Sequence, residues 1–226
     1  MGELQKVFVV DDDQPVRKSL EMLIRSVGLE VETFPSAREF LGTYQIGSPG
    51  CLVLDVRMPE MSGLELQRHL REQGVHMPII FITGHGDVPI AVRAMKDGAM
   101  EFLEKPFSKQ LLLEHIHEAL KRDALSRQER AKQSSVEACL ALLTARERQV
   151  MEHVISGKVS KEVAAELGIS KKTVDVHRAR MMRKMHVESL PELVERVVSS
   201  RQSRAGGAES LATRDGEPSR SSSQSL

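Results

Sequence analysis

The stretch "VFVVDDDQPV", residues 7–16, places three consecutive aspartates directly after four apolar residues. An uninterrupted apolar run of this kind is typical of a strand that is covered on both faces in a parallel sheet. Carboxylates that lie close together destabilise one another unless they are protonated or neutralised by a cation. Asp11, Asp12 and Asp13 therefore mark the end of a buried strand and, at the same place, a candidate cation site.

Four further short apolar runs follow within the first half of the chain. They are "VETF" (31–34), "CLVLD" (51–55), "PIIFIT" (78–83) and "EFLEK" (101–105). Segments with helical spacing separate the runs, and we expect helices over 17–27, 36–41, 64–71, 87–95 and 111–125. "SARE" and "SGLE" match capping boxes at two of the helix starts. Strands and helices in alternation predict an α/β fold, a doubly wound parallel sheet of five strands.

In sheets of this kind ligands bind beyond the carboxyl ends of the strands. The predicted strands bring five polar side chains to that edge: Asp11, Asp12, Asp55, Thr83 and Lys105. Hard oxygen ligands suit Mg²⁺, which would keep the carboxylates ionised and neutralise charge on a transferred phosphoryl group. One carboxylate oxygen would remain free to attack. Lys105 would add a positive charge and Thr83 a hydrogen bond to the phosphoryl oxygens.

The chain of 226 residues is long enough for two domains, and its charges are unevenly spread although 32 basic and 32 acidic residues cancel. Residues 1–120 hold 12 Lys/Arg against 18 Asp/Glu, whereas residues 143–200 hold 11 against 8. This asymmetry suggests different partners, with a polyanion for the second half. The expected layout is a domain over 1–120, a linker over 121–137 that either extends the preceding helix or forms a loose tether, a second domain over 138–200, and a disordered tail over 201–226.

The composition argues against several classes of protein. Cys51 and Cys139 lie far apart and outside any metal-binding spacing, which indicates reduced thiols. No apolar run in the sequence approaches the roughly 20 residues that cross a bilayer, so we expect a cytoplasmic protein without membrane contact. With no Trp, one Tyr and six Phe, stacking on single-stranded nucleic acid is not expected.

The segment "SKKTVDVHRARMMRKM", residues 170–185, carries six Lys or Arg residues and one acid. Helical spacing places four residues towards a core: Val174, His177, Met181 and Met185. Four others fall on the opposite side: Lys172, Val176, Ala179 and Arg183. An exposed face of small and cationic side chains fits a DNA major groove, and a solvated basic face is the alternative.

Further candidate DNA contacts flank this face. The start of the helix would hold backbone phosphates through Ser170, Lys171, Lys172 and Thr173. Arg178 is a further basic candidate. Asp175 is an acid next to a polyanion, and it would either favour the positive end of the helix or accept a hydrogen bond from cytosine N4.

Four segments, "VVDDD", "LVLDVRMPEMSGLE", "FITGHGD" and "EFLEKPF", resemble the receiver domain of bacterial two-component response regulators over residues 4–120. The segment "TGHGDVPIAV" is similar to the FixJ-like branch of that family. The resemblance implies that Asp55 is the phosphoacceptor for a sensor histidine kinase. It also implies the remaining roles: Mg²⁺ on Asp12, Asp55 and the backbone carbonyl of Arg57, Asp11 acting through water, Thr83 and Phe102 as the switch pair, and a cis bond between Lys105 and Pro106.

Two residues near this site have alternative interpretations. Asp13 would cap the helix that begins at Pro15, or would contact the metal through water. His85 would be a surface residue of a mobile loop, or a general base or metal ligand.

The segment "LTARERQVMEHVISGKVSKEVAAELGISKKTVDVHRARMMRKM", residues 143–185, resembles the LuxR-type helix-turn-helix domain of NarL/FixJ regulators, a likeness that covers about 138–200. The resemblance implies a scaffold helix over 160–168 and a recognition helix over 171–185. It also implies a final helix over about 190–200 that commonly makes the dimer contact. The apolar residues of that helix would serve the dimer or only their own domain: Leu193, Val194, Val197 and Val198.

Together these features predict a DNA-binding transcriptional regulator that is switched by phosphorylation of Asp55 and has no enzymatic turnover of its own. Phosphorylation would shift an existing equilibrium, and would either free the second domain from the first or expose a dimer surface around the helix over 87–95 and the strand over 101–105. Two recognition helices of a homodimer would then bind paired half-sites of an operator, and RNA polymerase is a further candidate partner. Two alternatives remain. One is a Mg²⁺-dependent aspartyl-phosphate hydrolase, although the loops after the strands are short, and the other is a DNA-binding regulator that needs no phosphorylation.

Overall fold

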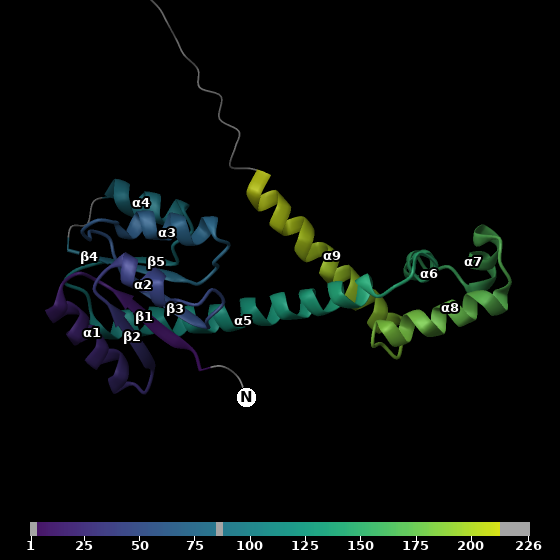
Figure 1. Cartoon of the computed structure of the whole chain (residues 1–226), viewed down its shortest axis with the longest axis horizontal. Helices are drawn as coiled ribbons and strands as arrows, with labels where there is room; N and C mark the ends of the chain where they lie inside the picture. Colours follow the sequence, from purple (N-terminus) through teal and green to yellow (C-terminus); the bar gives the residue numbers. More distant parts are fainter. Residues whose placement is uncertain (1–3, 85–87, 213–226) are drawn as a thin grey trace, which may run out of the picture. The chain divides into compact units, whose positions relative to one another are not determined.

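The computed structural model describes residues 4–84 and 88–212 of the chain. The chain divides into two compact units between Gln128 and Glu129 (Figure 1). Each unit buries its own set of apolar side chains: two clusters lie in the first unit and one in the second. Within the described residues, no helix is long and apolar enough to span a membrane.

The first unit is built on a parallel sheet whose strands match the five predicted runs. The strands are β1 (Lys6–Val10), β2 (Glu30–Phe34), β3 (Gly50–Asp55), β4 (Ile79–Thr83) and β5 (Glu101–Glu104). Their order in the sheet is β2-β1-β3-β4-β5, and every neighbouring pair is parallel. The direction of the strand order reverses between β1 and β3, which is where sheets of this type bind their ligands.

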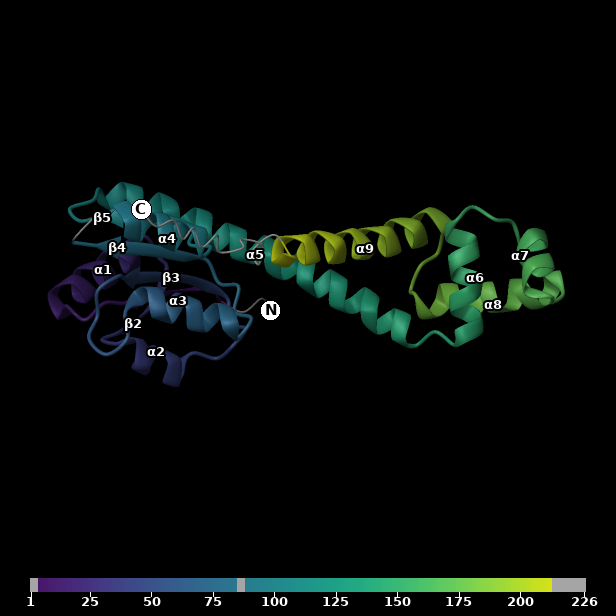
Figure 2. The ribbon, with the colours of Figure 1, turned by 90° about the horizontal axis from the view of Figure 1, so that it is seen from above.

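Helices cover both faces of this sheet (Figures 1 and 2). They are α1 (Gln14–Ser26), α2 (Ala37–Thr43), α3 (Gly63–Glu72), α4 (Val88–Lys96) and α5 (Lys109–Ala141). Buried residues of α2, α3 and α4, such as Phe40, Leu66 and Ala94, share one cluster. Those of α1 and α5, such as Ile24 and Ile116, share the cluster on the other face. The predicted doubly wound α/β fold is confirmed.

Capping side chains set the helix starts. Asp13 is the N-cap of α1 and accepts a hydrogen bond from the backbone N–H of Val16 at 3.4 Å, so this helix begins at Gln14, one residue before the Pro15 that was expected with this cap. The "SGLE" capping box is complete, because Ser62 and Glu65 each bond the other's backbone N–H. In "SARE" only one of the two capping-box hydrogen bonds is present, the one that the Glu39 N–H donates to the Ser36 hydroxyl. The predicted α4 start at Asp87, and His85 before it, lie outside the described residues.

The segment expected to link the domains, 121–137, is helical throughout, because it belongs to α5. The helical alternative is therefore the observed one. Asp123 is buried in the first unit, where its carboxylate accepts hydrogen bonds from the Gly50 backbone N–H at 2.9 Å and from Arg127 Nε at 2.7 Å. Val136 lies at the other end of the segment and packs into the core of the second unit.

The second unit contains α6 (Ala145–Ile155), α7 (Ser160–Leu167), α8 (Lys171–Lys184) and α9 (Leu190–Ala212). Both α6 and α7 pack against α8 (Figure 2). The helix α9 continues past the predicted end at Ser200, so the backbone of 201–212 is helical where a disordered tail was expected. Alanine, arginine, glutamine and leucine, which favour helices, make up much of that stretch, and it contains no proline. Residues 213–226 lie outside the described residues.

Candidate functional site

The ammonium group of a lysine contacts two of the predicted acids at the carboxyl edge of the sheet. Lys105, just after β5, places its Nζ 2.8 Å from Asp11 Oδ2 and 3.0 Å from Asp55 Oδ1. Asp11 follows β1 and is 1% exposed, whereas Asp55 ends β3 and is 7% exposed. The second oxygen of each carboxylate also accepts a hydrogen bond, Asp11 Oδ1 from the Asp13 N–H at 2.9 Å and Asp55 Oδ2 from the Arg57 N–H at 2.7 Å. The three side chains therefore form one hydrogen-bonded cluster.

The electrostatics of this cluster depend on burial. Burial raises the pKa of Asp55, and the negative charge of Asp11 raises it further, while the ammonium of Lys105 and the Arg57 N–H oppose the rise. For Lys105, burial lowers the pKa, but the hydrogen bonds and charges of Asp11 and Asp55 outweigh it and raise the pKa above its usual value. The lysine therefore stays charged, and its positive charge beside Asp55 favours the ionised form of that carboxylate.

Backbone contacts hold Lys105 at this edge. Its N–H donates to the carbonyl of Thr83 at 2.7 Å, and the bond to Pro106 is cis, as the family resemblance implies. Thr83 is buried at the end of β4. Phe102 on β5 is half-buried, with its ring 6.2 Å from that of Phe81. The predicted switch pair thus lies on neighbouring strands whose ends flank the acidic cluster.

Gly63, the first residue of α3, explains how the chain can pass close behind Asp55. A Cβ atom at this position would lie 2.2 Å from the backbone oxygen of Asp55, so any side chain would force the two segments apart. The Gly63 N–H donates to the Val56 carbonyl at 3.0 Å, which fixes the start of α3 beside the end of β3. The glycine in "MSGLE" is therefore a packing requirement of the site, a role that was not predicted from the sequence.

The expected metal ligands are only partly gathered. Asp12 follows Asp11 in the chain and is exposed, while Asp13 is occupied as a helix cap. Across residues 4–84 and 88–212, no three His, Cys, Asp or Glu side chains converge as a metal-binding cluster, and the Lys105 ammonium lies between Asp11 and Asp55. The donor set itself fits Mg²⁺, because carboxylate and carbonyl oxygens at one sheet edge are the ligands this ion prefers.

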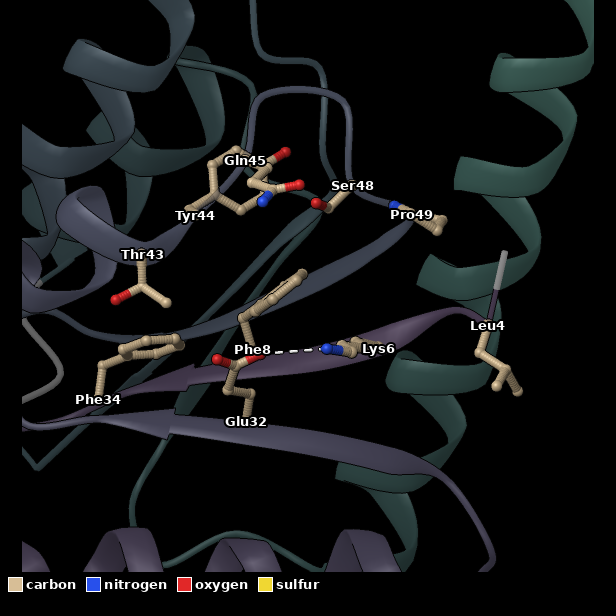
Figure 3. A pocket seen from close by; sticks show the side chains of 10 residues that line it. All are labelled: Leu4, Lys6, Phe8, Glu32, Phe34, Thr43, Tyr44, Gln45, Ser48 and Pro49. Atoms are coloured by element: carbon tan, nitrogen blue, oxygen red, sulfur yellow. Dashed lines mark hydrogen bonds and ion pairs between the residues drawn. The ribbon is translucent and has the colours of Figure 1, made fainter. Parts of the chain in front are cut away.

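A hollow of about 370 Å³ lies along β1 and β2 of the same sheet (Figure 3). Phe8 and Tyr44 line it with rings in edge-to-face contact at 5.5 Å, and the ion pair of Lys6 with Glu32 spans 3.4 Å at its side. None of the predicted site residues lines this hollow. It is therefore separate from the acidic cluster.

The second candidate surface is the exposed face of α8. Ser170 is the N-cap of this helix and accepts a hydrogen bond from the Thr173 N–H at 3.1 Å, so its hydroxyl has a structural task. The predicted two sides of the helix are confirmed for most positions. Val174, Met181 and Met185 are fully buried, whereas these residues are exposed: Lys171, Lys172, Thr173, Asp175, Val176, Ala179 and Arg183.

Two basic residues differ from the expected arrangement. Arg178 is only half-buried and, at 100° per residue, lies near the core side of α8. Arg180, which is not among the predicted DNA contacts, is exposed and lies beside Val176 and Arg183. The spacing i, i+4 from Val176 to Arg180 would have identified it.

The other end of α8 is tied down by a buried acid. Lys184 Nζ lies 2.7 Å from Glu147 Oε2 and also donates to the Leu142 carbonyl at 3.1 Å. The Lys184 hydrogen bond and the N–H of Thr144 together lower the pKa of Glu147 to about 2. Lys184 is therefore a structural residue, although it belongs to the basic helix.

The chain is similar to known proteins over both units. Residues 7–117 match the response regulator receiver domain, and residues 141–197 match the bacterial regulatory proteins of the luxR family. The response regulator protein TodT of Pseudomonas putida is 48% identical over 188 residues, which is 83% of each chain. The transcriptional regulatory protein FixJ of Azorhizobium caulinodans is 47% identical over 194 residues, 86% of this chain and 92% of that protein.

The chain belongs to the FixJ-like two-component response regulators. A solved structure of the response regulator StyR has 50% identity and a TM-score of 0.81, and covers 86% of this chain and 98% of its own. The response regulator thus combines a receiver domain, which carries the acidic cluster, with a LuxR-type DNA-binding domain, which carries α8. This combination is that of a transcriptional regulator, and a receiver domain implies a histidine kinase as partner.

Proposed function

We propose that this response regulator accepts a phosphoryl group from a sensor histidine kinase on Asp55. A carboxylate oxygen of Asp55 attacks phosphorus, the bond from phosphorus to the kinase histidine breaks, and its electron pair returns to the imidazole nitrogen. The observation that carries this proposal is the placement of Lys105 between Asp11 and Asp55. A fixed ammonium at that point neutralises charge on the phosphoryl oxygens as they approach.

The proposal includes Mg²⁺ as cofactor. Asp11, Asp12, Asp55 and the backbone carbonyl of Arg57 would hold the ion, Asp11 acting through water. Mg²⁺ would supply a second positive charge for the phosphoryl oxygens. Asp12 supports this assignment, because its exposed carboxylate can turn towards an incoming cation without breaking a hydrogen bond.

The switch is assigned to Thr83 and Phe102. The hydroxyl of Thr83 would turn towards the phosphoryl group on Asp55, and the half-buried ring of Phe102 would follow into the space that it vacates. Thr83 ends β4, which pairs with the strand of Asp55, and Phe102 lies on β5, which pairs with β4; this arrangement supports a coupling through β4. Phosphorylation would thereby shift the population of a receiver that favours homodimers.

The output is binding of double-stranded DNA through α8. Its exposed centre would enter the major groove with Lys172, Val176, Ala179 and Arg183. The residues at its start, Ser170, Lys171 and Thr173, would lie near phosphates, and Asp175 and Arg178 complete the set of proposed contacts. In α9, Leu193 and Val197 are fully buried in their own unit, so Val194 and Val198, which are half-buried, are the residues left for a dimer contact.

These partners place the protein in the cytoplasm, where kinase and chromosome are both accessible, and RNA polymerase is a further partner of the DNA-bound dimer. We assign no turnover of small-molecule substrates. The proposed domain limits are 1–120 for the receiver domain, 121–137 for the linker, 138–200 for the DNA-binding domain and 201–226 for the tail.

One experiment tests the proposal against both alternatives. The full chain is treated with a small acyl phosphate and Mg²⁺, the modified residue is located by mass spectrometry, and mass and operator affinity are measured before and after. We expect phosphate on Asp55, dimerisation and tighter DNA binding. Steady release of phosphate well above the decay of the aspartyl phosphate would favour the hydrolase. Asp55→Asn protein that binds as tightly as phosphorylated wild type would favour a regulator independent of phosphorylation.

A further inference from the structure

Asp175 is the acid on the exposed face of the basic helix α8. It lies one turn from Lys172 on one side and one turn from Ala179 on the other, so it shares their surface. Its side chain is exposed, and within the described residues it makes no hydrogen bond or ion pair. A carboxylate held against the phosphates of DNA repels them, so it lowers affinity for every sequence alike.

The two structural tasks that an acid commonly has in a helix do not apply to Asp175. The interaction with the positive end of a helix falls off within the first turn, and Asp175 is the fifth residue of a helix that begins at Lys171. Three basic side chains lie three or four residues from Asp175, and none of them forms an ion pair with it: Lys171, Lys172 and Arg178. Within its own domain the carboxylate therefore has no stabilising partner.

The neighbouring side chains leave room for a base pair next to this carboxylate. Ala179 is small and exposed, so the helix can approach a base edge closely at this point. Val176 is 43% exposed and presents an apolar surface of the kind that contacts a thymine methyl group. In the major groove the exocyclic amines are the only hydrogen-bond donors, and the N4 amine of cytosine is the usual partner of an Asp or Glu.

We propose that Asp175 determines operator specificity by accepting a hydrogen bond from a cytosine N4 amine in the major groove, while its charge weakens binding to all other DNA. This inference rests on the proposed function of α8 as the DNA-contacting helix. It resolves the two interpretations left open by the sequence in favour of base recognition.

The test uses the full chain, treated with a small acyl phosphate and Mg²⁺ as well as untreated. Randomised duplexes are selected with wild type, and the selected duplex, its single-base variants and a random duplex are then titrated. Asp175→Ala removes the carboxylate, and Asp175→Asn replaces it with an amide, which pairs best with adenine. Glu188→Ala is the matched control, because Glu188 is exposed in the turn after α8 and the change removes the same charge from the same domain.

For wild type we expect replacement of one C·G pair in each half-site to weaken binding roughly tenfold. In Asp175→Ala that preference falls to within about twofold, and binding to random duplex tightens more than in Glu188→Ala. In Asp175→Asn the preferred base at that position changes towards adenine. If Asp175→Ala retains every base preference of wild type, the inference is wrong although DNA binding stands. If wild type selects no sequence with or without phosphodonor, the proposed function itself fails.

Discussion

The ammonium of Lys105 lies 3.0 Å from Asp55 Oδ1, although 50 residues separate them in the chain. The contact opposes the increase in the pKa of Asp55 that burial causes. Because only the ionised carboxylate attacks phosphorus, Lys105 extends the pH range in which Asp55 reacts. The contact thus links the fold, which brings β3 and β5 to one edge, to the reactivity of the site.

Removing the charge of Lys105 should therefore slow phosphorylation most at low pH. For Lys105→Met we expect the rate with a small acyl phosphate to fall more at pH 6 than at pH 8, because loss of the ammonium raises the pKa of Asp55 further and leaves less of the carboxylate ionised at low pH. The pH–rate profile should shift to higher pH. Lys109→Met is the control, because Lys109 is exposed at the start of α5. An unshifted profile in Lys105→Met would contradict the assigned role.

Asp12 and Asp13 are adjacent acids with different expected effects on Mg²⁺ dependence. Asp12→Asn should raise the Mg²⁺ concentration for half-maximal phosphorylation at least about tenfold, because a neutral amide is a weaker ligand for this ion. Asp13→Asn should leave it within about twofold, since Asn caps helices as well as Asp does. Titration of the phosphorylation rate with Mg²⁺ measures both. If the Mg²⁺ concentration for half-maximal phosphorylation rises equally in the two variants, Asp13 contributes to the metal site.

The sheet and the acidic edge were predictable because they follow from local patterns. Short apolar runs mark buried strands, and the carboxyl ends of parallel strands meet at one edge, so the convergence of Asp11, Asp55 and Lys105 follows once the strands are assigned. Gly63 was missed because its importance lies in a contact with the backbone of Asp55, which no local pattern displays.

The contacts of the second unit were harder to predict for the same reason. Nothing near Lys184 in the sequence indicates that its partner is Glu147, which lies 37 residues earlier. The burial of Asp123 within the expected linker depends on a contact with Gly50 across 73 residues. Arg178 and Arg180 are both basic, and they differ in exposure because of the way that α8 is turned against the core of its unit.

That difference in exposure predicts unequal contributions of Arg178 and Arg180 to DNA binding. Arg180→Ala should weaken binding to the selected duplex about fivefold or more and should reduce the salt dependence by about one phosphate contact. Arg178→Ala should have the smaller effect on both. Binding measured over a range of salt concentrations compares the two matched variants. A larger loss in Arg178→Ala would mean that α8 meets DNA with a different face.

The pair of Glu147 and Lys184 makes the stability of the DNA-binding domain depend on pH. The pKa of Glu147 is about 2 in the folded state, below the ordinary value of 4.5. A lowered acid pKa contributes stability that is full above the unfolded value and is lost as pH falls from about 4.5 to about 2. Glu147→Gln should lower the unfolding free energy by about 1–3 kcal/mol at pH 7 and flatten this dependence. Glu166→Gln, which removes an exposed partner of Lys158, should change little.

Asp123, in the middle of α5, should protect the backbone amide at the start of β3 from hydrogen exchange. Its carboxylate accepts a hydrogen bond from the buried Gly50 N–H, and removal of the carboxylate leaves this donor without that partner. Asp123→Ala should therefore cost the first unit about 1–3 kcal/mol, whereas Asp123→Asn should cost less because its amide oxygen can still accept the bond. Glu118→Ala, at an exposed position on the same helix, is the control and should stay within about 0.5 kcal/mol of wild type. Denaturant unfolding measures the free energies, and hydrogen exchange at the Gly50 amide measures the contact directly. Exchange there should accelerate in Asp123→Ala beyond what the loss of global stability explains, and unchanged protection would show that another acceptor holds this end of β3.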